Sequence, residues 1–315
     1  MAFTREALAP PQTRPQRFGR LSLILAALTV GGKALGMVRE MLIAGRFGAT
    51  DETDAFYLAF SLTVALPMGL LIAIPQSLLP QYQALAKDDR PAAAELYGAA
   101  LLLAVLALGG LAAATFVGAA PLIERLAQRF SAETATSAVR WTRTMLPLLP
   151  LLGAASVIVS VAQARGHFVL VQFAVALLNV GAVLGLLVGP LDAGVGAAAI
   201  GYLLGSLAMA ATLLSYPLRE RLWPGLSGAG ARRAARILGS VVVIVALANG
   251  GGYAVELVER MFWVQLPSGQ LSCLGYAQRL AALPHFVLAG SLVVVLLPEL
   301  SGQREEGAAV ALAQR

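Results

Sequence analysis

The sequence is poor in the residues that build crosslinked folds and soluble active sites. It has one cysteine, Cys273, and two histidines among 315 residues. A disulfide framework and a multi-cysteine metal site are therefore excluded, and Cys273 is expected to be a small apolar packing residue. The chain also lacks a phosphate-binding glycine loop, an HExxH zinc motif and a GxSxG nucleophile elbow with partners. We therefore expect no enzyme activity, no cofactor and no bound metal.

Charged residues are also scarce. Asp, Glu, Lys and Arg make up 13% of the chain, against roughly 25% in soluble domains. Hydrophobic residues make up 58%, and the mean hydropathy is +0.76. Because a membrane-spanning helix needs about 20 mostly apolar residues, the sequence predicts an all-α polytopic membrane protein. Eight such segments are predicted, near residues 21–45, 55–82, 93–118, 138–163, 168–189, 194–216, 236–264 and 272–299.

The basic residues are distributed unevenly among the predicted loops. The proline- and arginine-rich residues 1–20 are too polar for a signal peptide and predict a cytoplasmic tail. With the N-terminus inside, 14 Lys and Arg residues fall on the cytoplasmic side and three on the opposite side. This bias predicts that both termini are cytoplasmic. The same bias explains the high isoelectric point of the chain, because the basic residues follow from topology and from contact with anionic lipid. Nucleic-acid binding is therefore a poor explanation of the positive charge.

The first two predicted helices resemble the last two, with offsets between 217 and 220 residues. The matching pairs are Arg39-Glu40 with Glu259-Arg260, Leu66-Pro67 with Leu283-Pro284, and Leu78-Leu79-Pro80 with Leu296-Leu297-Pro298. Repeated helical units are common in transporters. The repeat predicts a first six-helix lobe over residues 21–230 and the start of a second lobe over 231–315. The chain is then expected to be either a fragment of a longer protein or a shortened relative.

Several basic residues lie inside predicted spans, notably Lys33, Arg39 and Arg279. A cation at the centre of a spanning helix costs about 2.5 to 3.5 kcal/mol on insertion scales, so it normally faces a bundle interior or a water-filled cavity. We therefore interpret these three as cavity residues, with an interfacial anchor as the alternative. Asp54, which opens the second helix, is predicted either to pair with Arg39 or Arg46 or to act at a helix start.

Proline lies within several predicted spans. We expect Pro67, Pro75, Pro147, Pro150 and Pro284 to kink or interrupt their helices. Broken helices around a positively charged interior are typical of transporters that rock between two openings.

Two segments resemble a known family. GKALGMVREMLIAGRFGATDETDAFYLAF (32–60) is similar to the first-helix signature of the MurJ/MviN family, with its S-R-x-L-G-x-x-R-[DE], FG and DAF elements. GYAQRLAALPHFVLAGSLVVVLLPELS (275–301) resembles the pattern that opens the second lobe of that family. These are the lipid II flippases of the multidrug/oligosaccharidyl-lipid/polysaccharide (MOP) exporter superfamily.

The resemblance implies six-helix lobes around a cationic cavity, in a multi-pass protein of the bacterial inner membrane. It also implies transport of a polyprenyl-pyrophosphate-linked glycan by alternating access during peptidoglycan synthesis. Carried over by motif, Arg39, Arg279 and Lys33 would bind the substrate phosphates. Asp54, the aspartate of the DAF element, is counted with them as a substrate-binding residue. Lys33 stands where the family usually has arginine. The segment TVALPMGLLIAIPQSLLP (63–80) lacks the arginine and glutamate usual in the second helix.

Two alternatives remain open at the level of the sequence. The absence of charges from the second helix is consistent with a non-transporting partner of the enzymes that assemble envelope glycans. A partner protein is also expected as a possible source of the second lobe. Another MOP-type polysaccharide exporter is also compatible with the sequence. The sequence leaves the identity of the glycan and of any coupling ion open.

Overall fold

The computed structural model of the chain describes residues 14–65, 67, 70–189, 194–222, 224–248, 258–259, 262–263, 265–278 and 280–281. Throughout these residues the chain is helical and contains no strand, which confirms the predicted fold class. The helices are α1 (Arg14–Phe47), α2 (Asp51–Phe60), α3 (Leu70–Asp88), α4 (Arg90–Leu126), α5 (Ala132–Met145), α6 (Leu148–Ala164), α7 (Phe168–Val188), α8 (Gly196–Arg219) and α9 (Gly228–Ala248).

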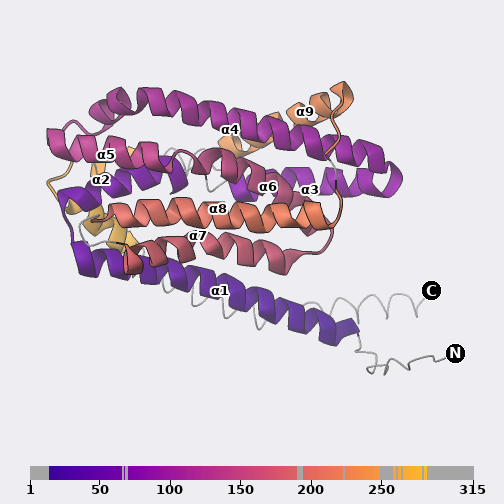
Figure 1. Cartoon of the computed structure of the whole chain (residues 1–315), viewed down its shortest axis with the longest axis horizontal. Helices are drawn as coiled ribbons and strands as arrows, with labels where there is room; N and C mark the ends of the chain where they lie inside the picture. Colours follow the sequence, from indigo (N-terminus) through magenta and orange to yellow (C-terminus); the bar gives the residue numbers. More distant parts are fainter. Residues whose placement is uncertain are drawn as a thin grey trace.

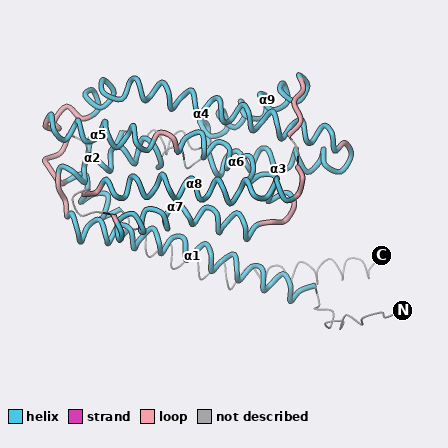
Figure 2. Tube along the Cα trace, viewed as in Figure 1, coloured by secondary structure: helices cyan, strands magenta, loops and turns pink. Residues whose placement is uncertain are grey.

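The long helices run side by side along the length of the bundle (Figure 1). α4 lies along one side and α1 along the other, with α5, α6, α8 and α7 between them. Figure 2 shows that the connecting loops gather at the two ends of the bundle. One end carries the turns that follow α3, α6 and α8, and the other carries the turns that follow α1, α4 and α7. The chain therefore alternates between the two ends, as the predicted multi-pass topology requires.

Two of the predicted proline interruptions are confirmed. Near Pro67, α2 continues into a one-turn π-helix, η1 (Ser61–Ala65), and α3 begins only at Leu70. Pro147 lies at the junction between α5 and α6, where it precedes the first residue of α6. A proline lacks the amide donor and its ring collides with the preceding turn, so a helix ends or bends there. Pro75, Pro80 and Pro150 lie within helices.

Four helical segments in the described part are long and apolar enough to cross a membrane: α4, α5 with α6, α7, and α8. Their outward faces carry large apolar side chains. For example, Leu184 of α7 is 53% exposed, Val188 is 80% exposed and Leu204 of α8 is 59% exposed. Such side chains are stable against lipid, where no hydrophobic force drives them inward. The apolar surface therefore agrees with a polytopic membrane protein.

Small residues hold α7 and α8 at close range. Gly181 and Gly185 face Gly201 and Gly205, and a Cβ atom added at any of the four would overlap the backbone of the opposite helix. In lipid, helices associate through packing and hydrogen bonds, so close backbone approach replaces the hydrophobic effect. This glycine contact fixes the α7–α8 pair that carries two residues of the site described below.

Some of the predictions lie outside the described residues. These are Arg279, Arg260, Pro284, most of the last predicted span, and hence the C-terminal halves of the repeat pairs. The division into a tail, a first lobe and the start of a second lobe remains a prediction.

Candidate functional site

The site centres on Arg39 and Glu40 in the second half of α1. Their side chains are buried, with exposed fractions of 7% and 4%. α1 packs along α7 in this region. On a helix, neighbouring residues point about 100° apart, yet both side chains bend into the same space between α1, α2, α7 and α8.

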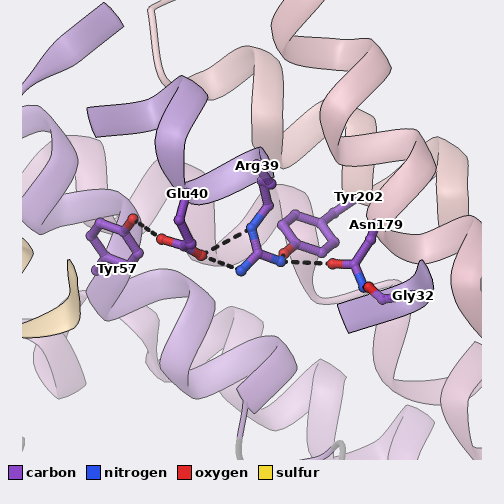
Figure 3. A network of polar contacts seen from close by, with 6 residues as sticks. All are labelled: Gly32, Arg39, Glu40, Tyr57, Asn179 and Tyr202. Atoms are coloured by element: carbon purple, nitrogen blue, oxygen red, sulfur yellow. Dashed lines mark hydrogen bonds and ion pairs between the residues drawn. The ribbon is translucent and has the colours of Figure 1, made fainter. Parts of the chain in front are cut away.

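Arg39 uses every nitrogen of its guanidinium group (Figure 3). Its Nε donates to Oε1 of Glu40 at 3.0 Å, and Nη2 donates to the same carboxylate oxygen. Nη1 donates to Oδ1 of Asn179 at 2.8 Å and to the hydroxyl of Tyr202. The guanidinium therefore links α1 to both α7 and α8.

Aromatic rings complete the surroundings of this cation. The Arg39 Cζ atom lies 5.2 Å from the ring centre of Phe60 and 5.3 Å from that of Tyr202. Ring faces attract cations, and the attraction grows when water is excluded. Arg39 is thus stabilised as a cation by one carboxylate, two neutral acceptors and two rings.

The network extends at both ends. Oε2 of Glu40 accepts a hydrogen bond from the hydroxyl of Tyr57 in α2. At the other end, Nδ2 of Asn179 donates to the backbone carbonyl of Gly32 at 3.4 Å. The six residues drawn in Figure 3 therefore connect four helices. Because one partner neutralises the other, the buried pair adds no net charge to the bundle interior.

The predicted site residues are not all brought together. Arg39 lies in the network, whereas Lys33, almost two turns earlier on α1, has an exposed side chain. Arg279 lies outside the described residues. The prediction that Asp54 pairs with Arg39 or Arg46 is wrong, because Arg39 pairs with Glu40 and Arg46 donates to the backbone carbonyl of Leu186.

Asp54 instead caps another segment. Its Oδ2 accepts from the amide of Gly269 at 2.8 Å, and its Oδ1 accepts from the amide of Ser272 at 2.8 Å and from the Ser272 hydroxyl. Helical structure begins at Gln270, so the carboxylate satisfies amides at a helix start. The alternative prediction placed Asp54 at the start of its own helix. Asp54 does lie in the first turn of α2, but the cap of that helix is Thr50, and the Asp54 carboxylate binds a different helix start.

Sequence reasoning missed four members of the network. Asn179, Tyr202 and Phe60 were not predicted to contact Arg39, and Tyr57 was not predicted to contact Glu40. A signal existed for Asn179, the one amide side chain in the apolar middle of its predicted span, since polar side chains there commonly hydrogen-bond across helices. No comparable signal marks the aromatic residues, which also occur as ordinary packing residues.

The apolar helices and the charged pair buried between them define a polytopic helical membrane protein. The sequence model of the family described as "Lipid II flippase MurJ" matches residues 43–315. The chain belongs to this family, whose name describes transporters and not catalytic enzymes.

Individual members of this family also match the chain in sequence and in structure. The lipid II flippase MurJ of Burkholderia cenocepacia is 30% identical over 303 residues, which cover 89% of this chain and 57% of that protein. A solved structure described as "Lipid II flippase MurJ, inward closed conformation" matches with a TM-score of 0.73 at 18% identity, over 90% of this chain and 59% of that one. The chain thus spans somewhat over half the length of these relatives, and the structural match establishes the shared fold.

Proposed function

We propose that this chain acts in a flippase that carries a polyprenyl-pyrophosphate-linked glycan, such as a lipid II-like peptidoglycan precursor, across the bacterial inner membrane. The observation that supports it most strongly is Arg39, a buried cation in the segment that resembles the family signature. A guanidinium group matches phosphate geometry with paired donors. Transport would proceed by alternating access, with the prenyl tail in lipid.

In this proposal Arg39 exchanges partners during transport. Its Nη1 atom donates to two neutral groups, Asn179 and Tyr202. A phosphate oxygen can replace either of them, because a hydrogen bond to a charged acceptor is stronger than one to a neutral acceptor. The contact with Glu40 holds the guanidinium in place while Nη1 is released. Rearrangement at Nη1 would also loosen α1 from α7 and α8, which couples substrate binding to helix movement.

Lys33 and Arg279 would supply further positive charge to the same substrate. Lys33 has an exposed side chain on α1, and Arg279 is assigned by the motif that it matches. We assign Asp54 to the connection between α2 and the segment from Gly269 and not to the substrate, because its carboxylate already accepts three hydrogen bonds there. The loops after α3, α6 and α8 would face the cytoplasm, on the basis of their arginines.

A second candidate function is a non-transporting partner in envelope glycan assembly. Two observations favour it: the segment 63–80 carries no charged residue, and the guanidinium of Arg39 is fully engaged within the protein. In that case the Arg39 network would have a purely structural role.

The deciding experiment measures transport by the protein as the cell makes it. Vesicles from native membranes would be loaded with a fluorescent polyprenyl-pyrophosphate glycan, and its accessibility on the opposite face would be followed over time. The variants are Arg39→Gln, Arg39→Lys and, as a control, Arg125→Gln, at an exposed position in the last turn of α4. We expect loss of transport with Arg39→Gln, partial transport with Arg39→Lys, and wild-type transport with the control. Unchanged transport by a correctly inserted Arg39→Gln variant would refute the proposal, and absence of transport by the wild type would favour the non-transporting partner.

A further inference from the structure

A second charged site lies away from the Arg39 network, at the end of the bundle that carries the turns after α3, α6 and α8. A pocket of about 800 Å³ opens there. Its lining includes Arg90, Arg165, Arg221, Tyr82 and Tyr97, and we call it the arginine–tyrosine pocket. None of these residues contacts the Arg39 network, so the pocket requires a separate explanation.

Three arginines reach this pocket from three separate parts of the chain. Arg90 begins α4, Arg165 follows α6, and Arg221 follows α8. One carboxylate, Glu220, also lines the pocket, and its oxygen is 3.8 Å from Nη1 of Arg165. Both side chains of this pair are about 40% exposed or more. An exposed pair with this separation contributes little, so the arginines retain donors for another anion.

Tyrosines form the wall of the pocket. Tyr82 and Tyr97 are almost fully buried, which presents them to the pocket and not to bulk solvent. Beside them, the Tyr216 ring packs against His167, another lining residue, with 4.8 Å between ring centres. Tyr216 supports the lining from behind: its ring contacts His167, and its own atoms do not line the pocket.

The backbone at the edge of the pocket is unusual. Arg221 has a φ of 50° and is the one described residue other than glycine with a positive φ. The left-handed conformation is unfavourable for an arginine. The conformation belongs to the turn that ends α8, in which the Leu222 amide donates to the Pro217 carbonyl at 2.8 Å. This turn places Arg221 in the lining of the pocket.

We propose that the arginine–tyrosine pocket binds a phosphate-bearing ligand. Arginine forks present paired donors to phosphate oxygens, and tyrosine hydroxyls add neutral donors. The site lies at the end of the bundle and not between its apolar faces, so it is open both to a lipid headgroup at the membrane surface and to a dissolved phosphate compound. Both sources share the same chemistry at the pocket.

The test uses the full chain in a neutral detergent, with inorganic phosphate titrated at constant ionic strength and hydrogen exchange followed by mass spectrometry. We expect phosphate to slow exchange at residues 165–167 and 219–222. Removing charge-assisted contacts with Arg165→Gln plus Arg221→Gln should weaken binding at least about tenfold. The matched control, Arg125→Gln plus Arg129→Gln at the opposite end, should bind as the wild type does.

The source of the ligand is assigned with nanodiscs of phosphatidylcholine alone or with added phosphatidylglycerol. Protection of the same segments by phosphatidylglycerol supports a lipid headgroup, and protection by inorganic phosphate in phosphatidylcholine discs supports a dissolved ligand. Protection by neither probe would overturn the proposal. So would equal loss of binding in the control double variant, because that indicates unspecific attraction to positive charge.

Arg221→Gly separates a structural role from a binding role. Glycine relieves the backbone strain, so this variant should fold at least as well as the wild type and still bind phosphate more weakly. Wild-type phosphate affinity in Arg221→Gly would show that the arginine side chain is not used, and would overturn its assignment to the site.

Discussion

The backbone amide of Ser272 donates to Oδ1 of Asp54 at 2.8 Å, and the two residues are 218 positions apart, the same spacing as the sequence repeat. The Ser272 hydroxyl also donates to Thr53 at 2.8 Å, and the Tyr276 hydroxyl donates to the carbonyl of Gly48 at 3.0 Å. These contacts join the start of α2 to the segment from Gly269, which the predicted repeat assigns to the second unit. Such contacts are expected where repeats pack around a common axis.

Asp54→Ala should destabilise the protein by about 1 to 3 kcal/mol, because it leaves buried donors of Gly269 and Ser272 without an acceptor. Asp54→Asn, which retains one acceptor oxygen, should lose less. The measurement is thermal unfolding of the full chain in detergent. Asp51→Ala, at an exposed position in the first turn of the same helix, is the control and should change stability little. Equal unfolding temperatures for the Asp54→Ala and Asp51→Ala variants would contradict the capping role.

Glu40→Gln should lower the free energy of unfolding more than removal of both charged side chains does. It leaves the Arg39 cation buried without a counter-charge, which costs about 3 to 5 kcal/mol. The double variant Arg39→Met plus Glu40→Met removes both charges and should recover much of that loss. A double-mutant cycle on unfolding free energies measures the coupling. Additive effects would mean that the two side chains do not depend on one another.

Tyr202→Phe removes one of the two neutral acceptors of the Arg39 Nη1 atom but retains the ring beneath the guanidinium. Because hydrogen bonds to charged groups contribute about 1.5 to 3 kcal/mol, a stability loss of that order is expected. In vesicles, the variant should also bind a pyrophosphate-bearing lipid at least as tightly as the wild type, because Nη1 is more available. Weaker binding by a correctly folded Tyr202→Phe protein would count against partner exchange at Nη1.

Gly205→Leu should separate α7 from α8. Its side chain would overlap the backbone near Leu177, and such overpacking typically costs about 1 to 3 kcal/mol or more. Crosslinking between cysteines placed on the two helices would report their separation, together with the unfolding temperature. Gly31→Leu on α1, where an added Cβ atom contacts nothing, serves as the matched control. Efficient crosslinking in the Gly205→Leu variant would exclude the predicted separation.

The sequence by itself determined the helical fold and two of the helix breaks. Long apolar runs exclude other ways of satisfying backbone hydrogen bonds in lipid, and Pro67 and Pro147 interrupt helices for local steric reasons. The motif around Arg39 also identified the family before any contact was known. These properties are set by neighbours in the chain, which is why they could be predicted.

Only the tertiary structure decided which residues are partners. Arg39 and Glu40 are adjacent on α1, and adjacent residues on a helix rarely face one another, yet their long side chains meet in one buried space. Asn179 and Tyr202 are 140 and 163 residues from Arg39, and Asp54 bonds to a segment more than 200 residues away. No local pattern encodes such contacts, because they depend on how helices pack and on which buried polar groups must be satisfied there.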